Sequence, residues 1–133
     1  MTEETSKEKE YIAYQGTKFT IEWFFDENGK SQSSEYFEEL DLSGKAKFLS
    51  LLKWMGDTGQ IRNEEKFRNE GDQIYAFKPK PHRFLCFFFQ GGKIIITSAF
   101  EKKQDKLPPP EKEKALKCKA SYEKRTEENN YYE

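Results

Sequence analysis

Hydrophobic and polar residues alternate over residues 17–26, TKFTIEWFFD. The apolar side chains there occupy every second position: Phe19, Ile21, Trp23 and Phe25. Successive side chains of a strand point to opposite faces of a sheet, so this spacing predicts a strand with one apolar face. The polar residues 27–30, ENGK, predict a turn after it.

The apolar spacing becomes helical after this turn. Residues 33–40, SSEYFEEL, carry apolar side chains at helical intervals, and Ser33 or Ser34 can cap the start of a helix. A break at residues 42–44 separates it from a second helix, which Ser43 can start. The second helix has an apolar stripe formed by Phe48, Leu49, Leu52 and Met55. We expect this stripe to pack against a sheet.

Three strand signals follow in quick succession, at residues 73–80, 82–90 and 93–101. The run from 84 to 89 is apolar on both faces, which is typical of a central strand covered on each side. A Gly-Gly turn joins the second and third of these strands. Residues 108–125, PPPEKEKALKCKASYEKR, predict a last helix started by proline.

The predicted elements are a strand, two helices, three strands and a final helix. This order indicates an α+β fold in which a three-stranded antiparallel meander carries the two helices on one face. The length of 133 residues indicates a single small domain. We place this domain at residues 17–125, between a flexible N-terminal segment at 1–16 and a flexible C-terminal tail at 126–133.

Charge is distributed unevenly along the chain. The whole chain has a net charge of -1, from 23 Lys/Arg and 24 Asp/Glu. Residues 1–72 carry 10 basic and 16 acidic residues, a balance of -6, whereas residues 73–125 carry 13 and 5, a balance of +8. A nearly neutral protein can therefore present a cationic face to nucleic acid. The alternative is a solvated lysine surface that binds nothing.

Several kinds of site and location have no support in the sequence. Cys86 and Cys118 lie in separate segments without metal-ligand spacing, and His82 is the single histidine, which argues against a zinc site. The first ten residues contain no apolar signal-peptide core, and no apolar run is long enough to span a membrane. We therefore expect a cytoplasmic protein with no membrane partner, no metal and no cofactor.

Three short motifs, in this order, resemble the RelE/ParE toxin superfamily. IYAFK at 74–78 looks like the family strand "lyELR", and RFLCFFF at 83–89 looks like "yRvlyff". AFEKKQDKLPP at 99–109 looks like "gFvKKtqktp", which precedes the last helix of the family. The resemblance covers residues 17–125 and is closest to the HigB-like, phage-derived branch of type II toxin–antitoxin systems.

The resemblance implies a concave sheet whose basic residues hold messenger RNA on the ribosome. In such toxins the RNA's own 2′-OH attacks the adjacent phosphorus in line and leaves a 2′,3′-cyclic phosphate, without a metal. This reaction needs a group that takes the 2′-OH proton, cations for the phosphate charge and a proton donor for the leaving 5′ oxygen. The resemblance also implies a cognate antitoxin, of the helix-turn-helix type, that covers the basic cleft.

Four residues fit the catalytic roles that the resemblance implies: Arg83, Lys78, Lys102 and His82. Arg83 matches the arginine of "yRvly" and either holds a phosphate through two hydrogen bonds or forms a strand-end ion pair. Lys78 stands in place of a family arginine, and Ala76 stands in place of a glutamate. His82 suits acid–base chemistry near neutral pH, although a lone loop histidine often has no such role.

Five further residues are candidates for binding RNA: Lys66, Arg68, Tyr75, Phe100 and Lys103. The first two either contact backbone phosphate or remain solvated beside their acidic neighbours. Lys102 and Lys103 match the lysine pair of the family, and only one of two neighbouring strand residues faces a given cleft. Phe100 can stack on a base, and Tyr75 can stack or donate a proton, although both also suit a core position.

Three functions are compatible with the sequence. The first is a ribosome-associated mRNA endonuclease toxin. The second is a non-catalytic, degenerate toxin or phage protein that binds RNA or a protein partner. The replacement of a family arginine by Lys78 and of a family glutamate by Ala76 favours it. The third is a gyrase-inhibiting relative within the same superfamily, against which the FEKK strand ending and the lysine-rich last helix argue.

Overall fold

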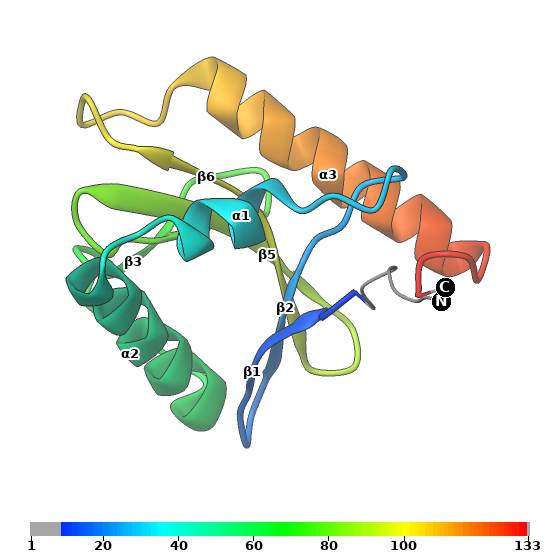
Figure 1. Ribbon diagram of the computed structural model, residues 1–133, viewed down its shortest axis with the longest axis horizontal. Helices are drawn as coiled ribbons and strands as arrows, with labels where there is room; N and C mark the ends of the chain where they lie inside the picture. Colours follow the sequence, from blue (N-terminus) through cyan, green and yellow to red (C-terminus); the bar gives the residue numbers. More distant parts are fainter. Residues whose placement is uncertain (1–8, 133) are drawn as a thin grey trace, which may run out of the picture.

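A six-stranded mixed sheet forms the centre of the computed structural model, which describes residues 9–132 (Figure 1). Its strands are β1 Ile12–Gln15, β2 Thr20–Trp23, β3 Phe67–Asn69, β4 Tyr75–Phe77, β5 His82–Phe89 and β6 Lys93–Glu101. The helices are α1 Gln32–Glu38, α2 Leu42–Thr58 and α3 Pro109–Glu127. Within the described part of the chain, no helix is long and apolar enough to cross a membrane.

The strands lie in the order β1-β2-β6-β5-β4-β3. Strand β2 is parallel to β6, and the other neighbouring pairs are antiparallel. The two longest strands, β5 and β6, occupy the centre, and residues 83–87 of β5 are all buried. The apolar side chains on both faces of β5 account for this central place, because helices cover the sheet on each side.

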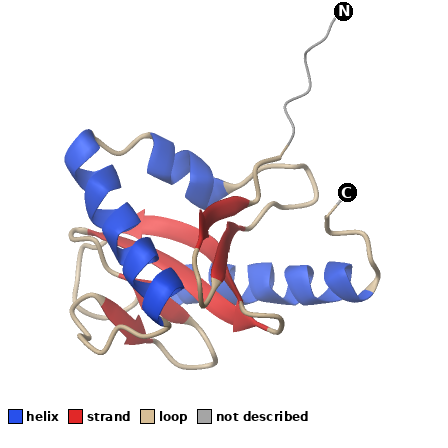
Figure 2. Ribbon diagram, turned by 90° about the horizontal axis from the view of Figure 1, so that it is seen from below, coloured by secondary structure: helices blue, strands red, loops and turns tan. Residues whose placement is uncertain are grey.

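Helices α1 and α2 cover one face of the sheet and α3 covers the other (Figure 2). On the first face the ring of Phe48 from α2 stacks on Phe84 of β5, with centroids 3.8 Å apart. On the second face Tyr122 of α3 packs edge-on against Phe87 of the same strand. The predicted α+β class and small single domain are confirmed.

Two short strands lie outside the predicted elements. Strand β1 falls within the segment 1–16, expected to be flexible, and β3 falls within the charged connection before residue 73. Strand β1 has four residues, and β3 has three, with Phe67 as its one buried side chain. Strands this short contain too few alternating positions for a sequence pattern to show them. The part of the expectation that concerns residues 1–8 lies outside the described residues.

The starts of the helices also differ from the prediction. Ser31 caps α1 in place of Ser33 or Ser34, and its hydroxyl accepts a hydrogen bond from the Ser34 N–H at 3.3 Å. Asp41 caps α2 by accepting from the Gly44 N–H at 2.7 Å. A capping side chain satisfies free N–H groups of the first helical turn. Because Asp41 supplies this cap, residues 42–44, which the sequence predicts to break the chain between the helices, form the first turn of α2.

The residues after α3 fold back onto the sheet, where the sequence predicts a flexible tail at 126–133. Tyr131 is 2% exposed, and its hydroxyl accepts a hydrogen bond from the Phe25 N–H at 2.9 Å. The Tyr132 hydroxyl donates to the Glu22 carboxylate at 2.7 Å. Two tyrosines therefore fix the tail as far as residue 132, and residue 133 lies outside the described part.

Replacing Tyr131 by alanine is expected to lower the free energy of unfolding by about 3 kcal/mol, because truncating a buried aromatic ring leaves a cavity. Tyr131→Phe keeps the ring and loses only the hydrogen bond to Phe25, so it should cost about 1 kcal/mol. Urea unfolding measures both values. Unchanged stability of Tyr131→Ala would show that the tail does not contribute to the core.

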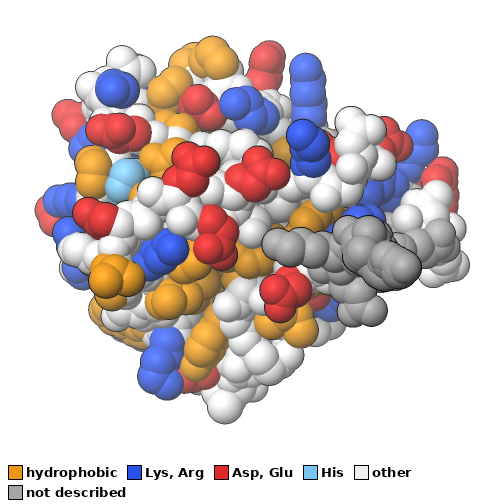
Figure 3. Space-filling view, viewed as in Figure 1, with side chains coloured by type: hydrophobic (Ala, Val, Ile, Leu, Met, Phe, Trp, Pro, Cys, Tyr) orange, Lys and Arg blue, Asp and Glu red, His pale blue; other side chains and the backbone are white. Residues whose placement is uncertain are grey.

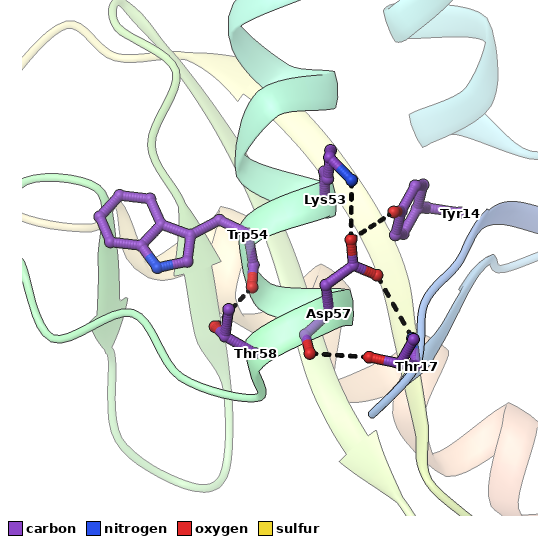
Figure 4. A network of polar contacts seen from close by, with 6 residues as sticks. All are labelled: Tyr14, Thr17, Lys53, Trp54, Asp57 and Thr58. Carbon is purple, nitrogen blue, oxygen red and sulfur yellow. Dashed lines mark hydrogen bonds and ion pairs between the residues drawn. The ribbon is translucent and has the colours of Figure 1, made fainter.

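A polar network ties α2 to the hairpin of β1 and β2 (Figure 4). The Asp57 carboxylate accepts hydrogen bonds from the Tyr14 hydroxyl at 2.8 Å and from Lys53 Nζ at 2.9 Å. The Thr17 hydroxyl donates to the Asp57 backbone carbonyl at 2.8 Å. The network joins residues about forty positions apart in sequence, and it holds the end of the helix at the turn of the hairpin.

Two glycines bring the helix and hairpin backbones into direct contact at this junction. The N–H groups of Lys18 and Phe19 donate to the Gly56 carbonyl at 2.7 and 3.0 Å. A Cβ atom built on Gly16 would overlap that carbonyl group, and one built on Gly56 would meet the ring of Tyr14. The absence of a side chain at Gly16 is therefore what allows these hydrogen bonds to form.

Candidate functional site

A cleft near the β3 edge of the sheet gathers four of the predicted site residues: Arg68, Lys78, Arg83 and Lys102. It has a volume of about 440 Å³ and lies where β3, β4 and β5 meet the loop after β6. We call it the cationic cleft and define it by its lining residues: Glu64, Glu65, Arg68, Glu70, Lys78, Lys80, Arg83, Lys102 and Asp105.

The register of the strands brings the cations to one face. Ala76 of β4 pairs with Arg68 of β3 and with Leu85 of β5, so these three side chains lie on the same face. Lys78 lies two positions after Ala76, and Arg83 lies two positions before Leu85. The period of two along a strand therefore directs Lys78 and Arg83 to the side that Arg68 occupies.

Strand β6 extends this face from the other side. Phe100 pairs with Arg83, and Lys102, two positions later, lines the cationic cleft. Lys103, its neighbour, does not line the cleft, and Phe100 is half-buried against the core on the α3 side. Lys66 lines a neighbouring groove beside α2 instead.

Arg83 forms the floor of the cationic cleft and is 7% exposed. Its guanidinium donates a hydrogen bond to the His82 carbonyl at 2.9 Å. None of the ion pairs within 4.0 Å among residues 9–132 involves Arg83. Burial lowers the pKa of the Arg83 guanidinium. Burying a charge without an oppositely charged partner costs free energy. Binding of an anion beside Arg83 would recover part of this cost.

Lys78 is the second cation of the floor. Its ammonium donates a hydrogen bond to the Glu64 carbonyl at 2.8 Å. Burial, followed by the positive charges of Arg83 and Arg68, lowers the pKa of Lys78. Lys78 is consequently a better proton donor than a solvated lysine, and the crowding of like charges favours the binding of an anion.

The loop after β6 adds an ion pair at the rim of the cationic cleft. Lys102 Nζ lies 3.2 Å from the carboxylate of Asp105, whose side chain is fully exposed. Exposed ion pairs contribute little to stability. Lys102 can therefore exchange the carboxylate of Asp105 for a phosphate at little cost.

The cationic cleft also contains residues that the sequence analysis does not assign to the site. Four acidic side chains line it together with five basic ones. The negative charge of Glu70 raises the pKa values of both floor residues, Lys78 and Arg83, which places its carboxylate near them. The sequence signal for Glu70 is its position two residues after Arg68, just beyond the end of β3.

His82 and Tyr75 lie on the other face of the sheet, on the side of α1 and α2. The Nδ1 atom of His82 and the Tyr36 hydroxyl are hydrogen-bonded at 2.7 Å. The ring of Tyr75 stacks on Phe67, with centroids 5.6 Å apart. His82 and Arg83 are successive residues of β5, and successive side chains of a strand point to opposite faces. The structure therefore does not bring His82 or Tyr75 into the cationic cleft.

A small α+β domain of this architecture is compatible with the RelE-like fold. Residues 35–120 match the model of the family described as Phage derived protein Gp49-like (DUF891), and the protein belongs to this family. The match includes every residue of the cationic cleft. The family consists of toxins of toxin–antitoxin systems within the RelE/ParE-like superfamily, which confirms the resemblance at that level and implies an antitoxin partner. A comparison with curated proteins found no match.

Proposed function

We propose that this protein is an mRNA endonuclease of the HigB-like branch, which cuts messages on the ribosome through attack of the RNA's own 2′-OH. The supporting observation is the buried Arg83, which has no carboxylate within ion-pair distance among the described residues. A guanidinium offers two parallel hydrogen bonds to the oxygens of a phosphate. A scissile phosphate in the cationic cleft supplies the missing negative charge.

The cationic cleft contains a group for each requirement of this reaction. Arg83 and Lys102 stabilise the charge that develops on the phosphate, as cations do in other phosphoryl-transfer sites. The Glu70 carboxylate takes the proton from the 2′-OH. Lys78, with its lowered pKa, gives a proton to the leaving 5′ oxygen. In this proposal Glu70 and Lys78 replace His82 as the acid–base pair, because His82 lies on the other face.

The experiment that tests this function combines the purified protein with translating ribosomes and maps the ends of the message. New ends that carry a 2′,3′-cyclic phosphate are expected, and expression of the protein should arrest growth. The same reaction without ribosomes shows whether cleavage depends on them. If neither new ends nor growth arrest is observed, the protein is not an endonuclease toxin.

Glu70→Gln is expected to slow cleavage by about 10²-fold, because loss of a general base typically costs at least that factor. The substitution keeps the size of the side chain and removes a negative charge from the cleft, so RNA should bind at least as tightly as before. Single-turnover cleavage and RNA affinity, measured on the same samples, separate the two effects. An unchanged cleavage rate would exclude Glu70 as the base.

We further propose that the antitoxin is a helix-turn-helix protein that covers the cationic cleft. Carboxylates of an antitoxin that reach Arg83 would supply the charge that the phosphate supplies during cleavage. The adjacent reading frame tests this directly, since it should encode a short helix-turn-helix protein. Co-expression of that protein should restore growth, and its complex should no longer bind RNA.

A non-catalytic RNA-binding protein is the second candidate function, and the position of His82 favours it. With the imidazole on the other face, the cationic cleft holds cations for binding, and of its four carboxylates Glu70 alone acts on the charges of both Lys78 and Arg83. This function predicts RNA binding that weakens steeply with salt, without cleavage in any of the assays above.

A further inference from the structure

A groove beside helix α2 adjoins the cationic cleft. It has a volume of about 340 Å³ and lies between α2, the residues before β3 and the loop that joins β4 to β5. We call it the Trp54 groove. The residues that matter for its chemistry are Lys47, Trp54, Glu65, Lys66, Lys78 and Lys80.

Trp54 presents an indole ring to this groove. The ring belongs to a side chain that is 41% exposed, whereas Trp23, the other tryptophan, is 7% exposed and packs against Phe37 and Phe48. Among the aromatic pairs of the described residues, none involves Trp54. Figure 4 shows its indole pointing away from α2, on the side opposite Tyr14. Its ring face is therefore open to a planar ligand.

The charged side chains of the Trp54 groove are mostly positive. Four lysines line it, and Glu65 is the one acidic residue in the lining. Glu65 lies 3.4 Å from Lys80 in an ion pair whose two side chains are largely exposed, so this pair holds Lys80 weakly. An aromatic ring among cations favours a ligand that combines a flat base with negative charge, as single-stranded nucleic acid does.

The Trp54 groove lies on the α2 side of the sheet and the cationic cleft on the other face, and the two adjoin beyond the start of β3 and the end of β4. Glu65, Lys78 and Lys80 line both of them, so the two meet along these residues. An RNA strand whose scissile phosphate lies on Arg83 can therefore continue past Lys78 into the Trp54 groove. The surface provides positive charge along this path, which is how proteins follow a phosphate backbone.

We propose that the Trp54 groove binds a nucleotide of the single-stranded RNA beside the cleavage point, with its base stacked on Trp54. Lys66 and Lys80 contact the phosphate of that nucleotide. This inference rests on the proposed function, because it takes the RNA in the cationic cleft as its starting point. It adds a binding site for a base at a place where the sequence predicts that Lys66 either contacts backbone phosphate or remains solvated.

The test uses fluorescence anisotropy with a labelled octauridylate and three variants. Trp54→Ala should weaken binding by about 5- to 150-fold, the range for loss of one base–aromatic stack. Trp54→Phe keeps an aromatic ring and should remain close to the unaltered protein. Leu49→Ala is the matched control. The sequence predicts Leu49 in the buried stripe of α2, but the structure leaves it 43% exposed, similar to Trp54, and it lines neither site. Melting temperatures confirm that all three variants fold.

A labelled diuridylate separates the two sites. It should bind through the cationic cleft alone, so Trp54→Ala should leave its affinity unchanged while Arg83→Ala reduces it. If Trp54→Ala binds octauridylate as tightly as the unaltered protein while Arg83→Ala binds it weakly, the base site is wrong and the proposed function stands. If the unaltered protein binds no RNA, both fail. If Trp54→Ala weakens only the complex with the antitoxin, the groove is a protein-binding site and the inference is overturned.

Discussion

Replacing Arg83 by alanine is expected to lower the rate of message cleavage by about 10²–10³-fold, the usual cost of removing one preorganised group that stabilises transition-state charge. Arg83 is the buried cation of the cleft floor, and no carboxylate pairs with it among the described residues. The loss should appear in the rate of the chemical step as well as in affinity, which Lys102 and Arg68 maintain only in part. Single-turnover cleavage at saturating protein measures this step.

Two comparisons make the Arg83 result specific. Arg83→Lys keeps the charge and loses the planar fork, so its rate should lie between those of Arg83→Ala and the unaltered protein. Arg62→Ala removes an exposed arginine that lines neither the cationic cleft nor the Trp54 groove, and it should cleave normally. Equal rates for Arg83→Ala and Arg62→Ala would exclude Arg83 from the reaction.

Gly16→Ala is expected to have the largest effect on stability, about 4 kcal/mol in the free energy of unfolding. The new methyl group would overlap the Gly56 carbonyl, which is backbone and cannot turn aside. The hairpin and α2 must therefore move apart, which adds the loss of the two hydrogen bonds to that carbonyl to the cost of overpacking. Urea unfolding with a global fit of the midpoint and slope measures the change.

Two other glycines provide the matched comparison. At Gly56 the added methyl group would meet the ring of Tyr14, which is a side chain, and alanine favours the helix by about 1 kcal/mol, so Gly56→Ala should cost less than Gly16→Ala. Gly91 has a positive φ of 84° and open space around it, so its alanine variant should lose about 1 kcal/mol from backbone strain alone. A Gly16→Ala variant no less stable than Gly91→Ala would refute the packing argument.

The long, strongly patterned elements of this fold follow from the sequence, and the short ones do not. The apolar run of β5 and the stripe on α2 each contain enough positions to specify a strand or a helix. Strands β1 and β3 have four and three residues, so their pairing partners determine them. The parallel pairing of β2 with β6 joins residues more than seventy positions apart, and no local pattern encodes it.

Some residues of the candidate site can likewise be predicted from the sequence, and others cannot. Alternation along single strands is enough to place Lys78, Arg83 and Lys102 on a common face once the register is known. The same rule applied to His82, next to Arg83, directs the imidazole to the opposite face. Trp54 and Lys66 come together only through the packing of α2 beside the residues that precede β3, which a pattern along the chain does not contain.

The space-filling view shows basic and acidic side chains intermixed over one broad face of the molecule, so charge alone does not outline a binding region there (Figure 3). The charge of the two sites is set by their lining residues, which are five basic and four acidic in the cationic cleft and four basic and one acidic in the Trp54 groove. A net charge of -1 over the whole chain is therefore compatible with a buried cation at Arg83.

The folded tail has a practical consequence for measuring single molecules. Lys93, at the start of β6, donates a hydrogen bond to the Tyr132 hydroxyl at 2.9 Å, whereas Lys102 follows the other end of the same strand. Nine residue steps of an extended chain separate these two lysines, which corresponds to about 30 Å. A dye or a surface tether placed beside Tyr132 would thus sit at the far pole from the cationic cleft. Such an attachment point allows the protein to be immobilised with the cationic cleft turned toward solution.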